Sequence, residues 1–205
     1  MSKKKKQKSK VREYAETLIV ALVIALFVRT FVVQAFKIPS GSMEPTLLVG
    51  DHILVSKFMY SIRIPVIGKK VVTFSNPRRG DVIVFIWPKD RSKDFIKRVI
   101  GLPGEKLEIR ERKIYINDRL IEDPWGVFSS WGPSSGDNYG PEVIPPHFLL
   151  VLGDNRDNSQ DSRYWGFVPL DDVLGKAFIM YWSWDWRASS LVSKVRWERI
   201  GHLIR

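Results

Sequence analysis

The chain begins with one long apolar segment. Residues 17–36 carry a single charged side chain, Arg29. Twenty helical residues span about 30 Å, which is the thickness of the hydrocarbon layer of a bilayer. The pattern therefore predicts one transmembrane helix over residues 17–36, with a tail over residues 1–16 before it and a separate domain over residues 37–205 after it.

Two other interpretations of this segment stay open. A basic start, an apolar stretch over residues 17–28 and small residues near position 35 are also typical of a cleavable signal peptide. A buried core helix would show the same run of apolar residues. We prefer a retained membrane anchor.

After Pro39 the pattern changes to short apolar runs broken by Gly, Pro and Asn. These runs predict strands over residues 52–58, 81–87, 94–100, 106–117, 148–152 and 175–183. Within 106–117, two alternating runs flank Glu111 and Arg112 and indicate a hairpin. Long amphipathic helical patterns are absent, so we expect a mainly β domain of folded antiparallel sheets or a partly closed barrel.

Residues 121–146 interrupt this pattern. The segment is rich in Gly, Pro, Ser and Trp and has little periodicity, so it is predicted to be an irregular, cap-like excursion. It is either a surface loop that aromatic side chains pack against the sheet, or one wall of a substrate cleft.

The charge of the chain is concentrated at its start. The formal net charge is +11, but seven of the 33 basic residues lie in the first twelve positions, where no acid occurs, leaving 26 basic against 22 acidic residues. A nucleic-acid-binding domain needs its basic residues on the folded surface, so no nucleic-acid partner is expected. Basic residues before a membrane helix stay in the cytoplasm, which predicts a cytoplasmic N-terminus and a domain on the outer face of the membrane.

The residue types also limit the chemistry. The chain has no cysteine, which excludes disulfides, a thiol nucleophile and cysteine-ligated metals. Its three histidines are scattered without the spacing of metal ligands. No metal and no cofactor are expected.

The first candidate for chemistry follows the membrane segment directly. Residues 38–47 read IPSGSMEPTL, in which Ser40 and Ser42 surround a glycine and prolines flank both. This is either a tight entry into the first strand or a rigid turn that presents a serine nucleophile beside oxyanion donors.

The second candidate is the predicted strand over residues 94–100, in the segment DFIKRVIGLPG. On a strand, Phe95, Lys97 and Val99 share one face, so a lysine stands in an apolar row. The lysine either extends its amine past the sheet edge into water, or it is desolvated. Lowering its pKa from about 10.4 to near 7 takes about 4–5 kcal/mol, which burial can supply, and a neutral lysine can act as a general base towards a serine.

The third candidate is the polar stretch over residues 153–163, GDNRDNSQDSR. Its acids suggest calcium, but it lacks the glycine at position six of a calcium loop and has Trp165 where such a loop needs a glutamate. A hydrogen-bonded loop whose Asp–Arg pairs hold nearby groups in place explains it better.

Taken together, these stretches resemble a known family. PSGSMEPTL, RRGDVIVF, DFIKRVIGLPG and GDNRDNSQDSR follow one another behind a membrane segment, as in the bacterial type I signal peptidases, and the resemblance covers essentially the whole chain. It implies a membrane-bound serine endopeptidase with Ser42 as nucleophile and Lys97 as general base. It also implies Ser40 as an oxyanion donor, Ser159 as the group that orients the lysine amine, and a support set made of Asp161, Arg163, Asp154 and Arg98.

The resemblance further implies the substrate. The family cuts signal peptides from exported preproteins after a small-x-small sequence such as Ala-x-Ala, bound by strand addition. The residues that match its shallow pockets are Phe36, Ile38, Met43, Leu47, Ile53, Val84, Phe95 and Ile96, although any β core is rich in such residues. The implied partners are signal peptides, membrane phospholipid and a nearby protein-export channel, and the implied location is the bacterial cytoplasmic membrane.

This chain departs from the family at three points. It has one membrane segment where some members have two, its 121–146 segment is shorter than in the larger members, and Glu44 stands where relatives often have an apolar residue. Two rival functions also remain: a Ser–Lys hydrolase that cleaves itself or a dedicated partner, and an anchored β module that binds extended peptides without cutting them.

Overall fold

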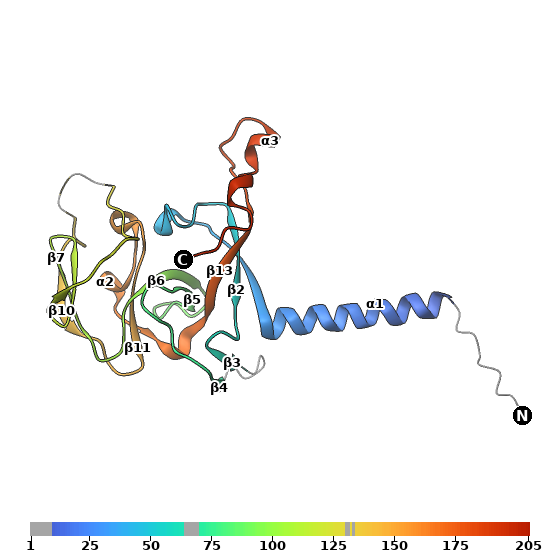
Figure 1. The fold of residues 1–205 in the computed structure, drawn as a ribbon, viewed down its shortest axis with the longest axis horizontal. Coiled ribbons are helices and arrows are strands. Elements are labelled where there is room, and N and C mark those ends of the chain that lie inside the picture. Colours follow the sequence, from blue (N-terminus) through green and yellow to red (C-terminus); the bar gives the residue numbers. More distant parts are fainter. Residues whose placement is uncertain (1–9, 64–69, 130–131, 133) are drawn as a thin grey trace, which may run out of the picture.

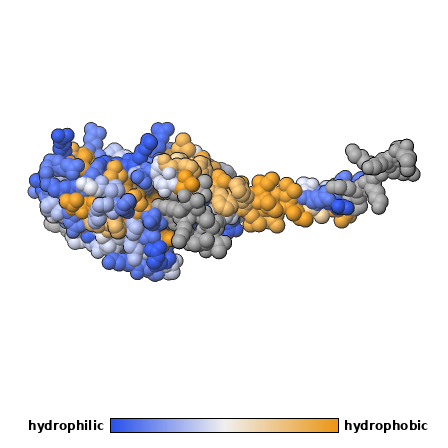
Figure 2. Space-filling model, turned by 90° about the horizontal axis from the view of Figure 1, so that it is seen from below, coloured by the Kyte–Doolittle hydropathy of each residue, from blue (hydrophilic) through white to orange (hydrophobic). Residues whose placement is uncertain are grey.

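The computed structural model describes residues 10–63, 70–129, 132 and 134–205. Helix α1 (Lys10–Phe27) continues as a π-helix (Val28–Val32), and neither contains a buried residue. Figure 1 shows α1 projecting from a β-rich body, and Figure 2 shows an apolar band along the part of the helix next to the body, with a hydrophilic stretch towards its N-terminal end. The combined helix, Lys10–Val32, is long and apolar enough to cross a membrane.

The bounds of this helix differ from the sequence prediction of 17–36. The helix starts earlier, and Val33–Lys37 forms strand β1 instead of its last turn. β1 pairs antiparallel with β2, from Val33 opposite Ser56 to Lys37 opposite His52. Tertiary pairing therefore decides the structure of an apolar run whose local pattern favours a continued helix. The lysines at positions 3–8 of the predicted basic tail lie outside the described residues.

The main sheet is antiparallel, with the strand order β1-β2-β13-β5-β6-β11-β12. Its strands are β1 (Val33–Lys37), β2 (Asp51–Ser56), β5 (Val82–Ile86), β6 (Asp94–Gly101), β11 (Phe148–Leu152), β12 (Val168–Pro169) and β13 (Val173–Ser183). The predicted mainly β, antiparallel fold is confirmed, and the five predicted stretches that fall on this sheet match its strands within two residues at each end.

A second antiparallel sheet has the order β10-β7-β8-β9 and lies at the end of the body away from α1 (Figure 1). Its strands are β7 (Lys106–Arg110), β8 (Lys113–Ile116), β9 (Arg119–Leu120) and β10 (Tyr139–Val143). Glu111 and Arg112 have φ angles of 48° and 67°, as expected for the predicted hairpin turn between β7 and β8. The 121–146 segment is thus not irregular throughout, because β10 pairs with β7.

The remaining elements are short. A hairpin of β3 (Ser61–Arg63) and β4 (Lys70–Thr73) forms a third, two-stranded sheet. The short helices are α2 (Ser162–Trp165), α3 (Leu191–Lys194) and four 3₁₀ turns, Gly41–Met43, Arg156–Asn158, Leu170–Asp172 and Trp197–Arg199.

Two buried clusters of apolar side chains pack at the centre of the main sheet. Successive β5 residues alternate between two buried clusters, with Val82 and Val84 in one and Ile83 and Phe85 in the other. Because directly opposite residues of paired strands share a face, Lys97, opposite Ile83 on β6, lies on the side of the second cluster. Arg98, opposite Val82, lies on the side of the first.

Candidate active site

Ser42 lies on a tight turn directly after β1. Ser40 is extended, with φ −136° and ψ 157°, and the chain then enters the 3₁₀ turn Gly41–Met43. Hydrogen bonds from the Ile38 amide to the Asp51 carbonyl and from the Gly50 amide to the Ile38 carbonyl hold the entry to this turn. Ser42 is therefore fixed at the edge of the sheet, where it is 9% exposed.

Lys97 points at Ser42 from the middle of the sheet. Its Nζ lies 2.5 Å from Ser42 Oγ, although 55 residues separate the two along the chain. The side chain is 4% exposed, and its Nζ lies 5.8 Å from the centre of the Phe95 ring. Burial lowers the pKa of Lys97 to about 8, although the carboxylates of Asp161 and Asp154 act in the opposite direction. A substantial fraction of the amine is therefore neutral in mildly alkaline solution.

Arg98, the next residue on β6, is held as a permanent cation. Its Nε and Nη2 donate to the two oxygens of Asp154 at 2.8 and 2.7 Å, and both residues are fully buried. Its Nη1 donates to the carbonyls of Gly80 and Arg205, and its Nη2 also reaches Thr46 Oγ1 at 3.3 Å. This bidentate pair ties β6 to the start of the polar loop after β11.

Asp161 and Arg163 hold the other end of that loop. Arg163 Nε and Nη2 donate to the two oxygens of Asp161 at 2.8 and 2.9 Å, and Asp161 also accepts from the Gly153 amide at 3.0 Å. A Cβ at Gly153 would lie 2.2 Å from Ser159 Oγ and 2.5 Å from the Ser42 carbonyl oxygen. A glycine is therefore required where the loop passes behind the 3₁₀ turn Gly41–Met43, which carries Ser42.

Ser159 lies in the same loop and is 4% exposed. Its Oγ has no hydrogen-bond partner within the described residues, so the expected contact with the Lys97 amine is not formed in this structure. The hydroxyl is buried beside Gly153, close to the turn that carries Ser42.

Asn155 is a site residue that our sequence analysis did not single out. Its Nδ2 donates to the Gly41 carbonyl at 3.2 Å, and its backbone amide donates to the Ser42 carbonyl at 3.2 Å. These two hydrogen bonds fix the backbone of the 3₁₀ turn on both sides of Ser42. The only sequence signal for this role is the polar loop itself, since the acceptors are backbone groups.

A cleft of about 490 Å³ opens at Ser42 and Lys97. Its lining residues come from the nucleophile turn, β6, the polar loop and the segment before α3: Ser40, Gly41, Ser42, Glu44, Val49, Phe95, Lys97, Asn155, Asn158, Gln160 and Arg187. Of the eight expected pocket residues, Phe95 alone is among them. Five others belong to the first core cluster and are at most 2% exposed: Ile38, Met43, Leu47, Ile53 and Val84. Phe36 and Ile96 are half-buried and pack against that cluster.

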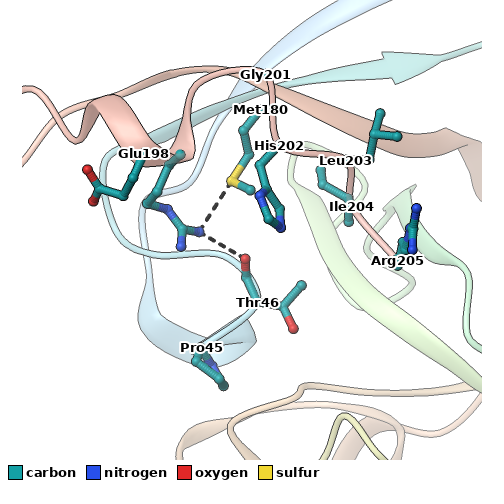
Figure 3. A pocket seen from close by; sticks show the side chains of 10 residues that line it. Pro45, Thr46, Met180, Glu198, Gly201, His202, Leu203, Ile204 and Arg205 are labelled. Atoms are coloured by element: carbon teal, nitrogen blue, oxygen red, sulfur yellow. Dashed lines mark hydrogen bonds between the residues drawn. The ribbon is translucent and has the colours of Figure 1, made fainter.

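A larger cavity, of about 740 Å³, lies between Pro45 and Thr46 and the C-terminal segment (Figure 3). It contains neither Ser42 nor Lys97. Arg199 lines it, donating to the Thr46 carbonyl at 2.9 Å and to Met180 Sδ at 3.2 Å. This cavity is therefore a gap between the C-terminal segment and the residues after Ser42, and the smaller cleft is the one that contains Ser42 and Lys97.

Among the described residues, no group of three or more His, Asp or Glu side chains is placed to hold a metal ion. The arrangement present is a buried serine hydroxyl in contact with a desolvated amine, which is the pair of groups that nucleophilic catalysis needs.

Comparisons with known proteins identify a peptidase family. The family model "Signal peptidase, peptidase S26" matches residues 11–182. The chain is 40% identical to a signal peptidase I of Pseudomonas aeruginosa, over 84% of this chain and 72% of that one, and 38% identical to a probable signal peptidase I-2 of Synechocystis, over 83% and 72%. A crystal structure of a signal peptidase I from Enterococcus faecalis aligns with a TM-score of 0.44 and 32% identity, over 51% of this chain and 98% of that one.

Proposed function

Since this chain belongs to the signal peptidase I family, peptidase S26, we propose that Ser42 and Lys97 are the catalytic pair of this serine peptidase and that it cuts signal peptides after a small-x-small sequence. The observation that carries the assignment is the 2.5 Å contact between Ser42 Oγ and Lys97 Nζ inside a buried site. The substrates of the enzyme are signal peptides.

The reaction starts from the neutral amine. Ser42 Oγ attacks the scissile carbonyl carbon while its proton passes to Lys97 Nζ. The resulting ammonium then protonates the nitrogen of the leaving peptide as the C–N bond breaks. Water attacks the acyl-enzyme with Lys97 again taking the proton, and Ser42 regains its hydroxyl hydrogen.

The negative charge that develops on the carbonyl oxygen needs donors. The Ser42 amide and the Ser40 hydroxyl, both at the cleft, supply them in this proposal. Asn155 donates to the carbonyls of Gly41 and Ser42 and thereby fixes the turn whose Ser42 amide would donate to the oxyanion. Ser159, buried and without a hydrogen-bond partner among the described residues, is available to orient the Lys97 amine.

The substrate lies extended across the cleft and adds to the edge of a strand. The half-buried Phe36 and Ile96, together with Phe95, would contact its small side chains directly. The five core residues named above would then form the floor beneath them and keep these pockets shallow.

The protein is membrane-anchored through the helix Lys10–Val32. We place the N-terminus in the cytoplasm and the β body on the outer face, because the basic residues precede the helix. The α3 segment and the β3–β4 hairpin lie on the side of the body from which α1 emerges (Figure 1). Exposed Trp186, Phe58 and Phe74 in these regions would contact membrane phospholipid, close to a protein-export channel that delivers substrate.

The test is cleavage of a model preprotein with an Ala-x-Ala site by the full-length protein in detergent. We expect a cut after the second alanine, shown by sequencing the product N-terminus, and no cut by Ser42→Ala. Ser92→Ala is a matched control on the exposed surface, where the hydroxyl donates to Asp90 in the same turn. A cut at another position would support the rival hydrolase of different specificity, and binding without any cut would support the peptide-binding module.

A further inference from the structure

The cleft carries two charged side chains that the Ser–Lys mechanism does not use, Glu44 and Arg187. Glu44 follows the nucleophile by two residues, and its amide donates to the Gly41 carbonyl at 3.1 Å. Its carboxylate folds back over the turn: a Cβ built on Gly41 would lie 3.0 to 3.2 Å from the carboxylate atoms. An acid therefore lies directly beside the turn that presents Ser42.

The Glu44 carboxylate has no hydrogen-bond or ion-pair partner among the residues that the structure describes. Among the described residues, no Lys, Arg or His nitrogen lies within 4.0 Å of its carboxylate, whereas Asp154 and Asp161 are each paired with an arginine. Within the described part of the chain, no carboxylate oxygen lies within 4.0 Å of the Arg187 guanidinium, and the backbone amide of Arg187 donates to Asp185. A half-buried carboxylate that lines a binding cleft without a counter-ion is free to pair with a charge on the ligand.

The ligand is an extended peptide whose small residues are fixed by the shallow pockets. A charge opposite Glu44 must therefore come from a position next to those residues, either between the two small ones or just beyond the scissile bond. We propose that Glu44 is a specificity-determining residue, which favours a lysine or arginine at one of these positions and disfavours an aspartate or glutamate there. This inference rests on the proposed function, since it concerns the same cleft.

Arg187 limits the region over which this preference acts. Its guanidinium lines the same cleft and repels a cationic side chain placed close to it. The preference for a positive charge is therefore confined to the part of the cleft next to the nucleophile turn, and the scan of substrate positions should show it at one position and not at all of them.

The experiment uses quenched fluorescent peptides with an Ala-x-Ala site and full-length protein in detergent. Lysine, glutamine or aspartate is placed in turn between the alanines, at the first residue after the cut and at the second. At one position we expect kcat/KM to be about tenfold higher for lysine than for aspartate, the size of one partly screened attraction plus one repulsion. The ratio should fall as salt is raised.

Three variants test the assignment to Glu44. Glu44→Gln should bring the lysine-to-aspartate ratio close to one, and Glu44→Lys should invert it. Glu111→Lys changes the net charge by the same amount as Glu44→Lys, but at the exposed tip of the β7–β8 turn. It should leave the ratio unchanged. A ratio in Glu44→Gln equal to that of the wild type at all three positions overturns the inference.

The outcome can be separated from that of the proposed function. The cut position in the glutamine peptides tests the proposed cleavage after the second alanine. The lysine-to-aspartate ratio is also measured as a ratio of Kd values for Ser42→Ala and for Ser42→Ala combined with Glu44→Gln, which requires no turnover. Equal Kd ratios in these two proteins contradict the role of Glu44 whatever the cleavage results.

Discussion

Lys97 and Arg98 are neighbours on strand β6, but their side chains lie on opposite faces and have different electrostatic surroundings. Lys97 is 4% exposed and Arg98 is fully buried, so both are removed from water. On one face, Lys97 contacts a neutral hydroxyl, and no carboxylate lies within 4.0 Å of its Nζ among the described residues. On the other face, the guanidinium of Arg98 donates to both oxygens of Asp154 and to two backbone carbonyls.

This difference shows that burial alone does not turn a basic side chain into a general base. Burial without a counter-ion favours the neutral form and lowers the pKa of Lys97 to about 8. Burial with a bidentate carboxylate keeps a guanidinium charged and makes it a fixed link between two segments. In the proposed mechanism, one strand therefore supplies the general base on one face and a structural cross-link on the other.

The largest expected effect comes from removing the Lys97 amine, the proposed general base. Lys97→Met should lower the rate of Ala-x-Ala cleavage by about 10⁴-fold or more, because the serine loses its base. The midpoint of thermal unfolding in detergent should stay unchanged or rise, because an apolar side chain replaces a desolvated amine. Lys93→Met, at an exposed pair with Asp90, is the control and should change neither quantity. More than one hundredth of wild-type activity in Lys97→Met contradicts its role as base.

Replacing Arg98, the basic residue with a structural role, should instead lower the stability of the protein. Arg98→Met leaves Asp154 buried and unpaired, which costs roughly 3–5 kcal/mol. At about 2–4 °C per kcal/mol for a chain of this size, the midpoint of thermal unfolding should fall by about 10 °C. Arg98→Met combined with Asp154→Leu should regain part of this loss, because no charge is then left buried. If the double variant is less stable than Arg98→Met alone, the ion pair is not the source of the effect.

Much of the fold could be predicted because it depends on local patterns. The strand over residues 148–152 has the predicted bounds, and the hairpin at Glu111 and Arg112 forms where the two alternating runs meet. β1 was predicted as helix because its apolar run continues that of α1 without a break. β10 contains Gly140 and Pro141, which are unfavourable in strands, and its pairing with β7 outweighs them.

The site residues also divide into those that the sequence predicts and those that it does not. Ser42, Lys97 and the Asp–Arg pairs stand out because their residue types and motif matches indicate chemistry. Asn155 does not, because it acts on backbone carbonyls 114 and 113 positions away in the chain, and no side-chain pattern encodes such a contact. The position of Gly153 against Ser159 likewise follows only from the packed loop.

The comparison also predicts a pH dependence of stability. Between about pH 8 and pH 10.4 the unfolded chain binds a proton at Lys97 that the folded protein does not, so stability should rise with pH across this window, by about 3 kcal/mol in total. Lys97→Met should lack this contribution, which is measured as the difference between its denaturant unfolding curves and those of the wild type at pH 8 and pH 10.4. Identical pH dependence in the two proteins would show that the amine is not desolvated.

A smaller effect is expected from the contact that orients the nucleophile. Asn155→Ala removes the bond to the Gly41 carbonyl, and we expect kcat to fall by about tenfold to a hundredfold with KM little changed, since the amides then aim less well at the oxyanion. Asn155→Asp should be at least as damaging, because a carboxylate then faces a carbonyl. The midpoint of the pH profile should stay at the wild-type value in both. A rise in KM with kcat unchanged would assign Asn155 to substrate binding instead.

The smallest expected effect is a shift of the pH profile when Phe95, which lies beside the Lys97 amine, is replaced. The rate of the wild-type enzyme should rise about tenfold per pH unit below pH 8 and level off above it, because only neutral Lys97 accepts the proton. Phe95 lies beside the amine and stacks on Trp87, with ring centres 4.8 Å apart. Phe95→Ser would admit water, return the pKa of Lys97 towards its ordinary value and move the midpoint of kcat/KM up by as much as about one pH unit. Phe95→Leu keeps an apolar cover and should leave the midpoint near 8. A midpoint that stays near 8 in Phe95→Ser would mean that the rest of the core, and not this ring, keeps the face of Lys97 dry.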